Sequence, residues 1–341
     1  MRLLVIRLSA MGDAAMVAPV LRGMRQSHPE TEIILLTRKA FGPFFKGIEG
    51  VELFFPDLNG KHYGLAGLYR LFRDITGKGK ISHVIDLHDV LRSSILRAFF
   101  RMAGVGNTVI SKGRKEKESV IKGHSRQQLK HTVERYRDVF RRAGYPFEIP
   151  EGPWITPATH VSEAVMPRRG EGDRLNIGIA PFSRHKLKSW PLKNMISLME
   201  RIGEKYRVKF WLFGGKDEIQ DLRSIAARVM DSELVAGAFS PGEEITLISR
   251  LDLMISMDSA NMHLAALTGT RVVSIWGATS PLTGFGPWRQ PPEYEAGIPV
   301  SELDCRPCSV FGKGECRRGD MACLRWLSAE KVFERVEEAI K

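Results

Sequence analysis

The sequence predicts an α/β protein with two doubly wound, Rossmann-like domains. Short runs rich in β-branched residues alternate with amphipathic helical stretches, a pattern typical of parallel sheets with crossover helices. A stretch rich in Pro, Gly and Glu, 145–173, interrupts the alternation once and is expected to be a linker. The length of 341 residues is sufficient for two cores. We therefore expect two domains facing each other across a cleft, where such folds bind ligands.

Each expected strand is a short apolar run followed, in most cases, by a helical pattern. The first half contains five such runs: 2–8, 32–37, 51–55, 82–87 and 107–111. The second half contains four: 174–180, 207–213, 251–256 and 270–276. We place the first domain at 1–160 and the second at 170–327. The last helix, 328–341, could instead pack back on the first domain.

Composition limits the class of protein. Hydrophobic residues make up 43% and charged residues 26% of the chain, as in soluble globular proteins. No apolar run approaches the roughly 20 residues needed to cross a bilayer, and four cysteines in so long a chain favour a reducing cytoplasm. The net charge of +12, from 51 basic and 39 acidic residues, indicates an anionic partner, which could be nucleic acid, a membrane surface or a phosphorylated substrate.

Several nucleotide-binding motifs are absent. The first predicted strand is not followed by G-x-G-x-x-G, and the chain contains neither G-x-x-x-x-G-K-[ST] nor a D-x-D pair. The sequence therefore does not support assigning the chain to the dinucleotide dehydrogenases or the P-loop NTPases. A nucleoside diphosphate would have to be bound by cationic side chains and helix N-termini, without a metal.

Asp13 is the first candidate functional residue. It follows Gly12 at the start of a helical pattern whose apolar face is formed by Val17, Val20, Leu21 and Met24. Asp13 could simply cap this helix, which would contribute about 1 kcal/mol. Alternatively, it is a general base at the mouth of the cleft, where it takes a proton from a substrate hydroxyl. Pro19 should kink the helix or mark its restart.

The stretch 256–288 contains the second candidate site. A predicted strand leads into Asp258, and a short helix follows that ends near Gly269. The first backbone N–H groups of this helix form a natural anion site suited to a diphosphate. They belong to Ser259, Ala260, Asn261 and Met262. Asp258 could cap the helix or bind sugar hydroxyls.

Two further features concern charge and cysteine. Between Lys112 and Arg142 the chain carries eleven basic and four acidic residues. They form either a solvated surface or a contact for an anionic acceptor or its membrane, with Arg114, Lys115 and Arg126 as candidate contacts. Four cysteines with the spacing C-x₂-C-x₇-C-x₆-C could hold a structural zinc, but the second pair lacks the usual C-x₂-C spacing, so free thiols are favoured. They are Cys305, Cys308, Cys316 and Cys323.

Five segments in consecutive order resemble landmarks of the glycosyltransferase family 9 heptosyltransferases. They are "RLSAMGDAAMVAPVLRGMRQSHPETEI", "VIDLHDVLRSSIL", "HTVERYRDVFRRAGY", "KSWP" and "DSANMHLAALTGTRVVSIWGATSP". The resemblance implies a GT-B fold, with the acceptor held mainly by the first domain and the nucleotide-sugar by the second. It further implies inverting transfer of heptose from ADP-heptose to the inner core of lipopolysaccharide, at the cytoplasmic face of the inner membrane.

The resemblance also implies residue roles. It places the general base at Asp13, the diphosphate-binding lysine at Lys188 and the donor-sugar aspartate at Asp258. Ser183 falls where the family has a hydroxyl near the phosphates, and Glu218 falls, on a looser alignment, at a ribose contact. Gly12 is expected beside the acceptor. Ala260 stands where many relatives have glycine, and its methyl group would narrow the approach to the donor.

We therefore expect a cytoplasmic, monomeric enzyme that needs no cofactor and touches the inner membrane transiently. Its expected partners are a nucleotide-sugar donor and an anionic glycolipid acceptor. Two alternatives remain at this point. One is a nucleotide-sugar epimerase of GT-B architecture, and the other is a basic nucleic-acid-binding protein, which accounts for the charge but for none of the landmarks.

Overall fold

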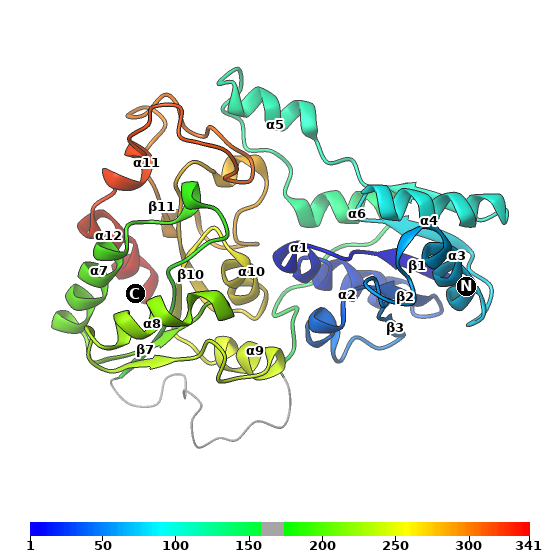
Figure 1. Cartoon of the computed structure of the whole chain (residues 1–341), viewed down its shortest axis with the longest axis horizontal. Coiled ribbons are helices and arrows are strands. Elements are labelled where there is room, and N and C mark those ends of the chain that lie inside the picture. Colours follow the sequence, from blue (N-terminus) through cyan, green and yellow to red (C-terminus); the bar gives the residue numbers. More distant parts are fainter. Residues whose placement is uncertain (158–173) are drawn as a thin grey trace. The chain divides into compact units, whose positions relative to one another are not determined.

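A computed structural model describes residues 1–157 and 174–341 of the chain, which form two compact units (Figure 1). The first unit comprises Met1–Lys112 and Thr132–Thr156. The second comprises Gly113–His131 and the described residues from Pro157 to Lys341. The segment Gly113–His131, which we predicted within the first domain, therefore packs with the second unit.

The first unit is built on a five-stranded parallel sheet with the order β3-β2-β1-β4-β5. Its strands are β1 (Arg2–Ile6), β2 (Glu32–Leu36), β3 (Val51–Phe54), β4 (His83–Asp86) and β5 (Gly106–Val109). All five lie within predicted runs or one residue beyond them. The helices are α1 (Met11–Ala15), α2 (Ala18–Ser27), the 3₁₀ helix η1 (Lys39–Phe45), α3 (Gly64–Thr76), α4 (Leu91–Met102) and α6 (Thr132–Arg142).

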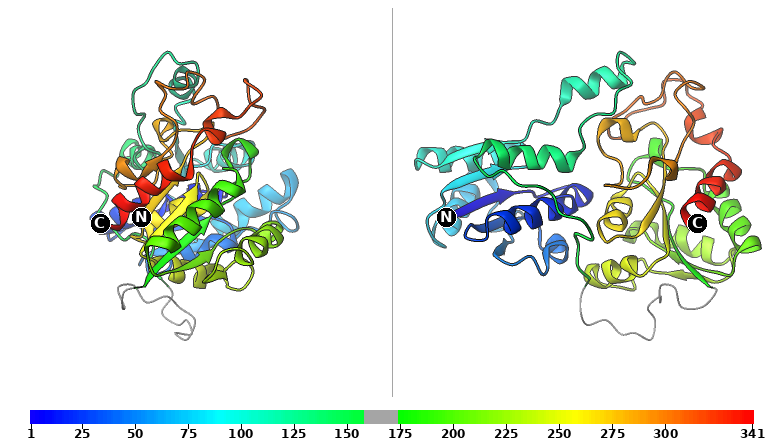
Figure 2. Two further views of the ribbon diagram at one scale, coloured as in Figure 1. Left: turned by 90° about the vertical axis from the view of Figure 1, so that its left-hand side faces the viewer. Right: turned by 180° about the vertical axis from the view of Figure 1, so that it is seen from behind.

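Helices cover both faces of this sheet (Figure 2). Helices α3 and α4 pack together on one face, whereas α2 and α6 pack together on the other. Residues Leu3 to Ile6 of β1 are fully buried, which explains their continuous apolar run. The predicted interruption at Pro19 is confirmed, because α1 ends at Ala15 and α2 restarts at Ala18 with the proline in its first turn.

The second unit contains a six-stranded sheet, again parallel, with the order β11-β10-β9-β6-β7-β8. Its strands are β6 (Leu175–Ala180), β7 (Val208–Leu212), β8 (Ser232–Leu234), β9 (Leu253–Met257), β10 (Arg271–Ile275) and β11 (Glu295–Ala296). Strands β8 and β11 were not predicted. They contain three and two residues, too few for a hydrophobic period to show.

The first helix of the second unit in chain order, α5 (Arg114–Ile121), lies in the segment Gly113–His131. It is followed by η3 (Lys186–Lys188), α7 (Leu192–Lys205), η4 (Lys216–Glu218), α8 (Ile219–Ala226), α9 (Pro241–Ser249), α10 (Ala260–Leu267), η5 (Pro281–Thr283), η6 (Pro292–Tyr294), α11 (Ala322–Arg325) and α12 (Ala329–Ile340). Helix α12 packs against α7, β9 and β10 through Val332, Phe333 and Val336. The alternative that the last helix packs on the first domain is therefore wrong, since its apolar face is buried in the second core.

The predicted linker differs from the structure in its first part. Tyr145, Phe147, Trp154 and Ile155 are buried in the first unit, and Arg22 donates a hydrogen bond of 2.5 Å from Nε to the carbonyl oxygen of Trp154. Aromatic side chains among the prolines and glycines give this stretch enough apolar surface to pack. The rest of the predicted linker, 158–173, lies outside the described residues.

Both candidate sites lie where the strand order of a sheet reverses. In the first unit that point is between β1 and β4, and Asp13 follows β1 in the sequence. In the second unit it is between β6 and β9; Ser183 follows β6 and Asp258 follows β9. Ligands of open α/β sheets bind at such points, beyond the carboxyl ends of the strands.

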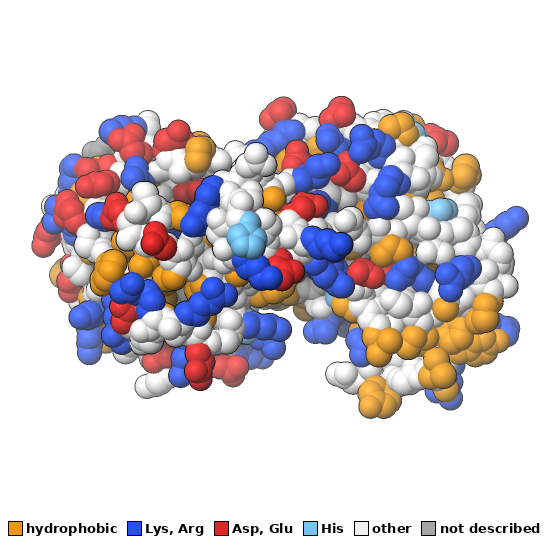
Figure 3. All heavy atoms as spheres, turned by 90° about the horizontal axis from the view of Figure 1, so that it is seen from above, with side chains coloured by type: hydrophobic (Ala, Val, Ile, Leu, Met, Phe, Trp, Pro, Cys, Tyr) orange, Lys and Arg blue, Asp and Glu red, His pale blue; other side chains and the backbone are white. Residues whose placement is uncertain are grey.

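The surface of the first unit carries exposed apolar side chains, which gather over α3 and α4 (Figure 3). In the part of the chain that the structure describes, no helix is both long enough and apolar enough to span a bilayer.

Candidate active site

In the first unit, Asp13 is held by a cation and a backbone amide. Its Oδ2 atom lies 2.9 Å from Nη2 of Arg7 and accepts a 3.2 Å hydrogen bond from the backbone N–H of Ala10. Ala10 occupies the cap position of α1, so Asp13 stands at the third helical residue. Asp13 is therefore not the N-cap residue, although it does satisfy a backbone donor at this helix start.

Arg7 is the residue at this site that the sequence analysis missed. It is buried and donates a 2.5 Å hydrogen bond from Nη1 to the carbonyl oxygen of Leu87, at the end of β4. Tyr136 of α6 donates from its hydroxyl to the carbonyl oxygen of Asp13 at 3.2 Å. Strands β1 and β4 and helix α6 thus fix the position of one carboxylate. The signal was the charge of Arg7 inside the apolar run 2–8, for which the sequence shows no partner.

A second polar group lies at the end of β4. The carboxylate of Asp86 is fully buried, accepts hydrogen bonds from the backbone N–H groups of His88 and Asp89, and lies 2.8 Å from Nε of Arg97. Nε2 of His88 lies 3.0 Å from Oγ of Ser9. Burial, together with the charge of Arg7, lowers the pKa of His88 to about 4, so its imidazole is neutral at pH 7.

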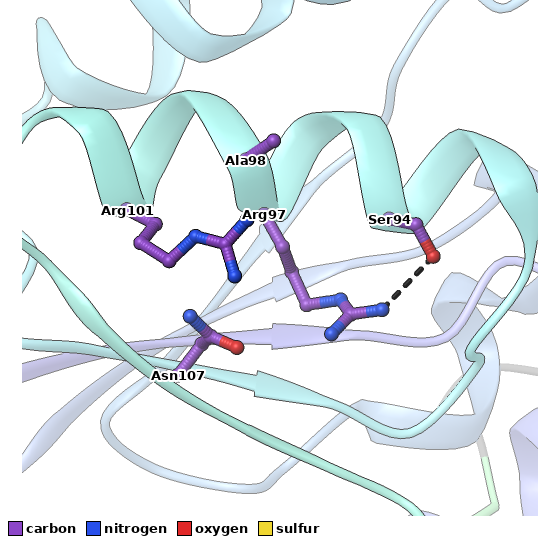
Figure 4. Close-up of a pocket in the computed structure, with 5 residues that line it drawn as sticks. All are labelled: Ser94, Arg97, Ala98, Arg101 and Asn107. Atoms are coloured by element: carbon purple, nitrogen blue, oxygen red, sulfur yellow. Dashed lines mark hydrogen bonds between the residues drawn. The ribbon is translucent and has the colours of Figure 1, made fainter.

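Arg97 also borders a small cavity between α4 and β5 (Figure 4). The cavity has a volume of about 170 Å³ and is lined by Ser94, Arg97, Ala98, Arg101 and Asn107. The charge of Arg97 is already compensated by Asp86 and, at 3.5 Å, by Asp89. We therefore assign this cavity no ligand.

In the second unit, three residues predicted for the donor site and one further residue form a single polar group. Asp258 is buried, with Oδ2 3.1 Å from Nζ of Lys188 and accepting a 2.8 Å hydrogen bond from Oγ1 of Thr279. Ser183 donates from Oγ to the carbonyl oxygen of Asp258 at 3.0 Å. The structure thus brings together Ser183, Lys188 and Asp258, and adds Thr279, which the sequence analysis missed.

Helix α10 begins directly after Asp258. Ser259 is its N-cap residue and makes no side-chain capping hydrogen bond; its hydroxyl lies 3.1 Å from that of Ser256. Asp258 is therefore not the cap, and this alternative is wrong. The N–H groups of Ala260, Asn261 and Met262 form the first turn of an eight-residue helix, which carries partial positive charge. Beside Lys188, this turn is suited to an anionic group.

A buried arginine holds the loop that carries Thr279. Arg306 donates from Nε to the carbonyl oxygen of Gly277 at 2.7 Å and from Nη2 to that of Thr279 at 3.4 Å, and Nη1 binds the carbonyl oxygen of Ile298. The same loop is joined to Leu187, next to Lys188, by a 3.0 Å hydrogen bond from the backbone N–H of Ala278. Arg306 thus fixes the loop on which the partner of Asp258 lies.

Other predicted contacts have different surroundings. Glu218 accepts a 2.6 Å hydrogen bond from the backbone N–H of Gly215 and so caps its own helix start. Arg114 and Lys115 begin α5 in the second unit. Arg126 donates from Nη1 to the carbonyl oxygen of Arg306 at 2.9 Å. Gly12 is buried within α1, beside Asp13.

The cysteines are free thiols, and Cys323 is buried. Burial, followed by the nearby charges of other thiols, raises the pKa of Cys308, and burial raises that of Cys323 to about 11. Among the described residues, no group of three or more His, Cys, Asp or Glu side chains is arranged to hold a metal ion. The structural zinc stays a prediction, since metal binding would itself draw thiolates together.

Two α/β units with parallel sheets, each with polar residues at its strand-order reversal, make up the GT-B fold. The model of glycosyltransferase family 9 (heptosyltransferase) matches residues 68–311. The chain belongs to this family, and it is a glycosyltransferase.

Individual relatives agree with this membership. The chain is similar to the lipopolysaccharide core heptosyltransferase OpsX of Haemophilus influenzae, with 23% identity over 82% of this chain and 80% of the relative. Its fold is similar to that of a family 9 glycosyltransferase from Veillonella parvula, with a TM-score of 0.76, 19% identity, and coverage of 99% and 97% of the two chains. The heptosyltransferase WaaC of E. coli, solved with ADP, gives a TM-score of 0.69 and 17% identity, with coverage of 99% and 100%.

Proposed function

We propose that this enzyme transfers heptose from ADP-heptose, with inversion, to the inner core of lipopolysaccharide or a related lipid-linked acceptor. The observation that carries the proposal is the group formed by Lys188, Asp258 and the first turn of α10, at the strand-order reversal of the second sheet. The names of relatives support the choice of sugar and acceptor, because OpsX is a lipopolysaccharide core heptosyltransferase and WaaC has been solved with ADP.

Inverting transfer is a single displacement. The acceptor hydroxyl attacks the anomeric carbon as it loses its proton, and the nucleoside diphosphate leaves from the opposite face. We assign proton removal to the carboxylate of Asp13, which Arg7 and the N–H of Ala10 hold in one orientation. A positioned base typically contributes a factor of about 10² to 10⁴ to the rate.

The leaving group develops negative charge on its terminal phosphate. Lys188 and the N–H groups of the first turn of α10 would stabilise that charge without a metal ion. The carboxylate of Asp258, fixed by Thr279, would accept hydrogen bonds from sugar hydroxyls while it keeps Lys188 in place. Ser183 would donate a hydrogen bond to a phosphate oxygen if it released the carbonyl oxygen of Asp258.

The finer parts of the proposal concern partners and place. We propose a glycolipid acceptor, and we place the enzyme at the cytoplasmic face of the inner membrane, as a monomer that touches the bilayer transiently. A requirement for no cofactor belongs to the same proposal. The basic segment with Arg114, Lys115 and Arg126 packs with the second unit, and we retain it as a contact for the anionic acceptor.

A donor screen by thermal unfolding tests the proposed function. ADP-heptose should raise the melting temperature of the full chain more than UDP- or GDP-sugars do, since a ligand adds RT ln(1 + [L]/Kd) to stability. Lys188→Ala should lose most of this shift. Lys186→Ala, an exposed lysine in the same 3₁₀ turn, should keep it.

Transfer itself is then measured with a heptose-deficient lipopolysaccharide acceptor. Release of ADP only when this acceptor is present supports the proposal. Conversion of the donor into an isomer in the absence of acceptor would instead show an epimerase, and no shift with any nucleotide-sugar would overturn the assignment of the donor site.

A further inference from the structure

Helix α4 presents an apolar stripe to the solvent. Its core-facing residues, Ser93, Leu96 and Phe100, are buried in the first unit. Leu91, Ile95, Ala98 and Met102 recur at i, i+4, i+7 and i+11, and therefore line a different side of the helix. Leu91 is 79% exposed and Met102 is 76% exposed. Ile95 and Ala98 are half-buried, and Ile95 packs against the core of the first unit. A surface helix ordinarily has polar residues on that side, so the exposure of Leu91 and Met102 is not explained by the packing of the unit.

Helix α3 extends the apolar surface. Leu65 and Tyr69, four residues apart, are 65% and 47% exposed, and Tyr63 just before the helix is 72% exposed. The ring of Tyr69 contacts that of Phe99 on α4 edge to face, with centroids 5.5 Å apart. The two helices therefore present one continuous area, which we call the α3–α4 patch and define as Tyr63, Leu65, Tyr69, Leu91, Ile95 and Met102.

Positive charge surrounds the α3–α4 patch. Its rim consists of exposed arginines on both helices: Arg70, Arg73, Arg92 and Arg101. Helix α4 contains no acidic residue, and the one acidic residue of α3, Asp74, is already paired with Lys61 at 2.5 Å and with His62 at 2.9 Å. An apolar area with a cationic rim matches the interface of an anionic bilayer, where apolar and tyrosine side chains enter the headgroup region and arginines meet lipid phosphates (Figure 3).

The α3–α4 patch begins near the candidate catalytic carboxylate. Helix α4 starts three residues after His88, which contacts Ser9 in the loop that precedes Asp13. Both helices follow strands of one parallel sheet, so their N-terminal ends lie at the carboxyl edge of that sheet. We propose that the α3–α4 patch docks the enzyme on the anionic surface of a bilayer, so that the carboxyl edge of the first sheet meets the acceptor headgroup. This inference rests on the proposed lipid-linked acceptor.

Co-sedimentation of the full chain with lipid vesicles tests the inference. We expect binding to vesicles of phosphatidylcholine with phosphatidylglycerol that salt weakens, and weaker binding to vesicles of phosphatidylcholine alone. The variant Leu65→Ser/Leu91→Ser/Met102→Ser should lose about tenfold or more of its partitioning, because it removes apolar side chains that would enter the bilayer. Arg92→Gln/Arg101→Gln should lose binding to the anionic vesicles selectively.

The matched pair is Leu91→Ser and Met230→Ser, since Met230 is 87% exposed on the second unit. Only the first should weaken vesicle binding. Both should keep wild-type transfer to a deacylated, water-soluble acceptor, a readout that separates docking from catalysis. A wild-type chain that binds vesicles but shows no transfer would count against the proposed function alone.

Two outcomes would overturn the inference. In the first, the triple variant binds vesicles as well as wild type while substitutions in the basic segment 113–131 abolish binding, which would place the membrane contact there. In the second, analytical ultracentrifugation without lipid shows a dimer that the triple variant loses, so that the α3–α4 patch would bind a second copy of this chain.

Discussion

Asp13 illustrates how two roles can share one carboxylate. The N–H of Ala10 is a helix-start donor and Arg7 is a buried cation, and both bind the same Oδ2 atom. The bonds that cap the helix therefore also orient the carboxylate, and its other oxygen, Oδ1, is the atom that we propose takes the proton of the acceptor hydroxyl. The sequence alone could not separate capping from catalysis, because the sequence pattern does not predict the contact between Asp13 and Arg7.

Asp13→Asn separates the two roles. The amide preserves the size of the side chain and removes the base, so we expect turnover to fall by about 10²- to 10⁴-fold. The amide oxygen can still accept the hydrogen bond from the N–H of Ala10, so any loss of stability should come from the ion pair with Arg7. The thermal shift caused by ADP-heptose should not change, because Asp13 lies in the unit that we assign to the acceptor.

Asp57→Asn is the control, since Asp57 accepts hydrogen bonds from the backbone N–H groups of Gly60 and Lys61 in the same unit. It should lower stability and leave turnover intact. Near wild-type turnover of Asp13→Asn would leave capping as the only role of Asp13.

Among the elements, the longer strands and the two strand-to-helix connections could be predicted from the sequence. Apolar runs of five or six residues identified β1 and β6, and the glycine at 269 identified the end of α10, where its φ is +83°. What could not be predicted depends on contacts distant in sequence. Arg306 lies 29 residues from Gly277, whose carbonyl oxygen it binds, and no local period encodes such a contact.

The loop 277–279 should transmit changes at Arg306 to the donor site. Arg306→Met leaves three carbonyl oxygens without their donor, and each unsatisfied buried acceptor costs about 1–3 kcal/mol. We expect a large loss in denaturant unfolding and a smaller thermal shift with ADP-heptose. Thr279→Val removes only the 2.8 Å hydrogen bond to Asp258, and should reduce the donor shift with little loss of stability.

Arg271→Met serves as the comparison, because Arg271 likewise binds a carbonyl oxygen, that of Ala339 at the end of α12. It should lower stability without changing the affinity for the donor. If Thr279→Val bound the donor as wild type does, Thr279 would not position Asp258.

At the scale of the whole molecule, His88 contributes a loss of stability in mild acid, and His131, whose pKa burial also lowers to about 4, acts in the same direction. Glu244 and Glu295, whose pKa values burial raises to about 7, act in the opposite direction. The folded protein keeps the imidazole of His88 neutral down to a pKa of about 4, whereas the unfolded chain takes up its proton near 6.5. Between these values the unfolded state binds more protons, so its population rises as the pH falls. The contribution approaches about 1.4 kcal/mol per pH unit, and above the unfolded pKa it has no further effect.

Urea unfolding between pH 7 and pH 4 measures this contribution. His88→Gln should be less stable at pH 7, since it replaces a packed ring, and should show a shallower decline on acidification. The carboxylates of Asp57 and Asp74, whose pKa values are lowered by hydrogen bonds, act in the same direction but only below their usual range. An equal slope in wild type and variant would exclude a contribution from His88.

The route of the chain has a consequence for inheritance. The polypeptide leaves the first unit after Lys112, joins the second as Gly113–His131, and returns at Thr132. That segment supplies donors to four carbonyl oxygens of the second unit, those of Pro281, Leu282, Gly286 and Arg306. A recombination event in the stretch between the two units would therefore separate these donors from their acceptors. We therefore expect a chimera joined between the two units to lose stability in the second unit, unless Gly113–His131 comes from the same parent as the carbonyl groups that it binds.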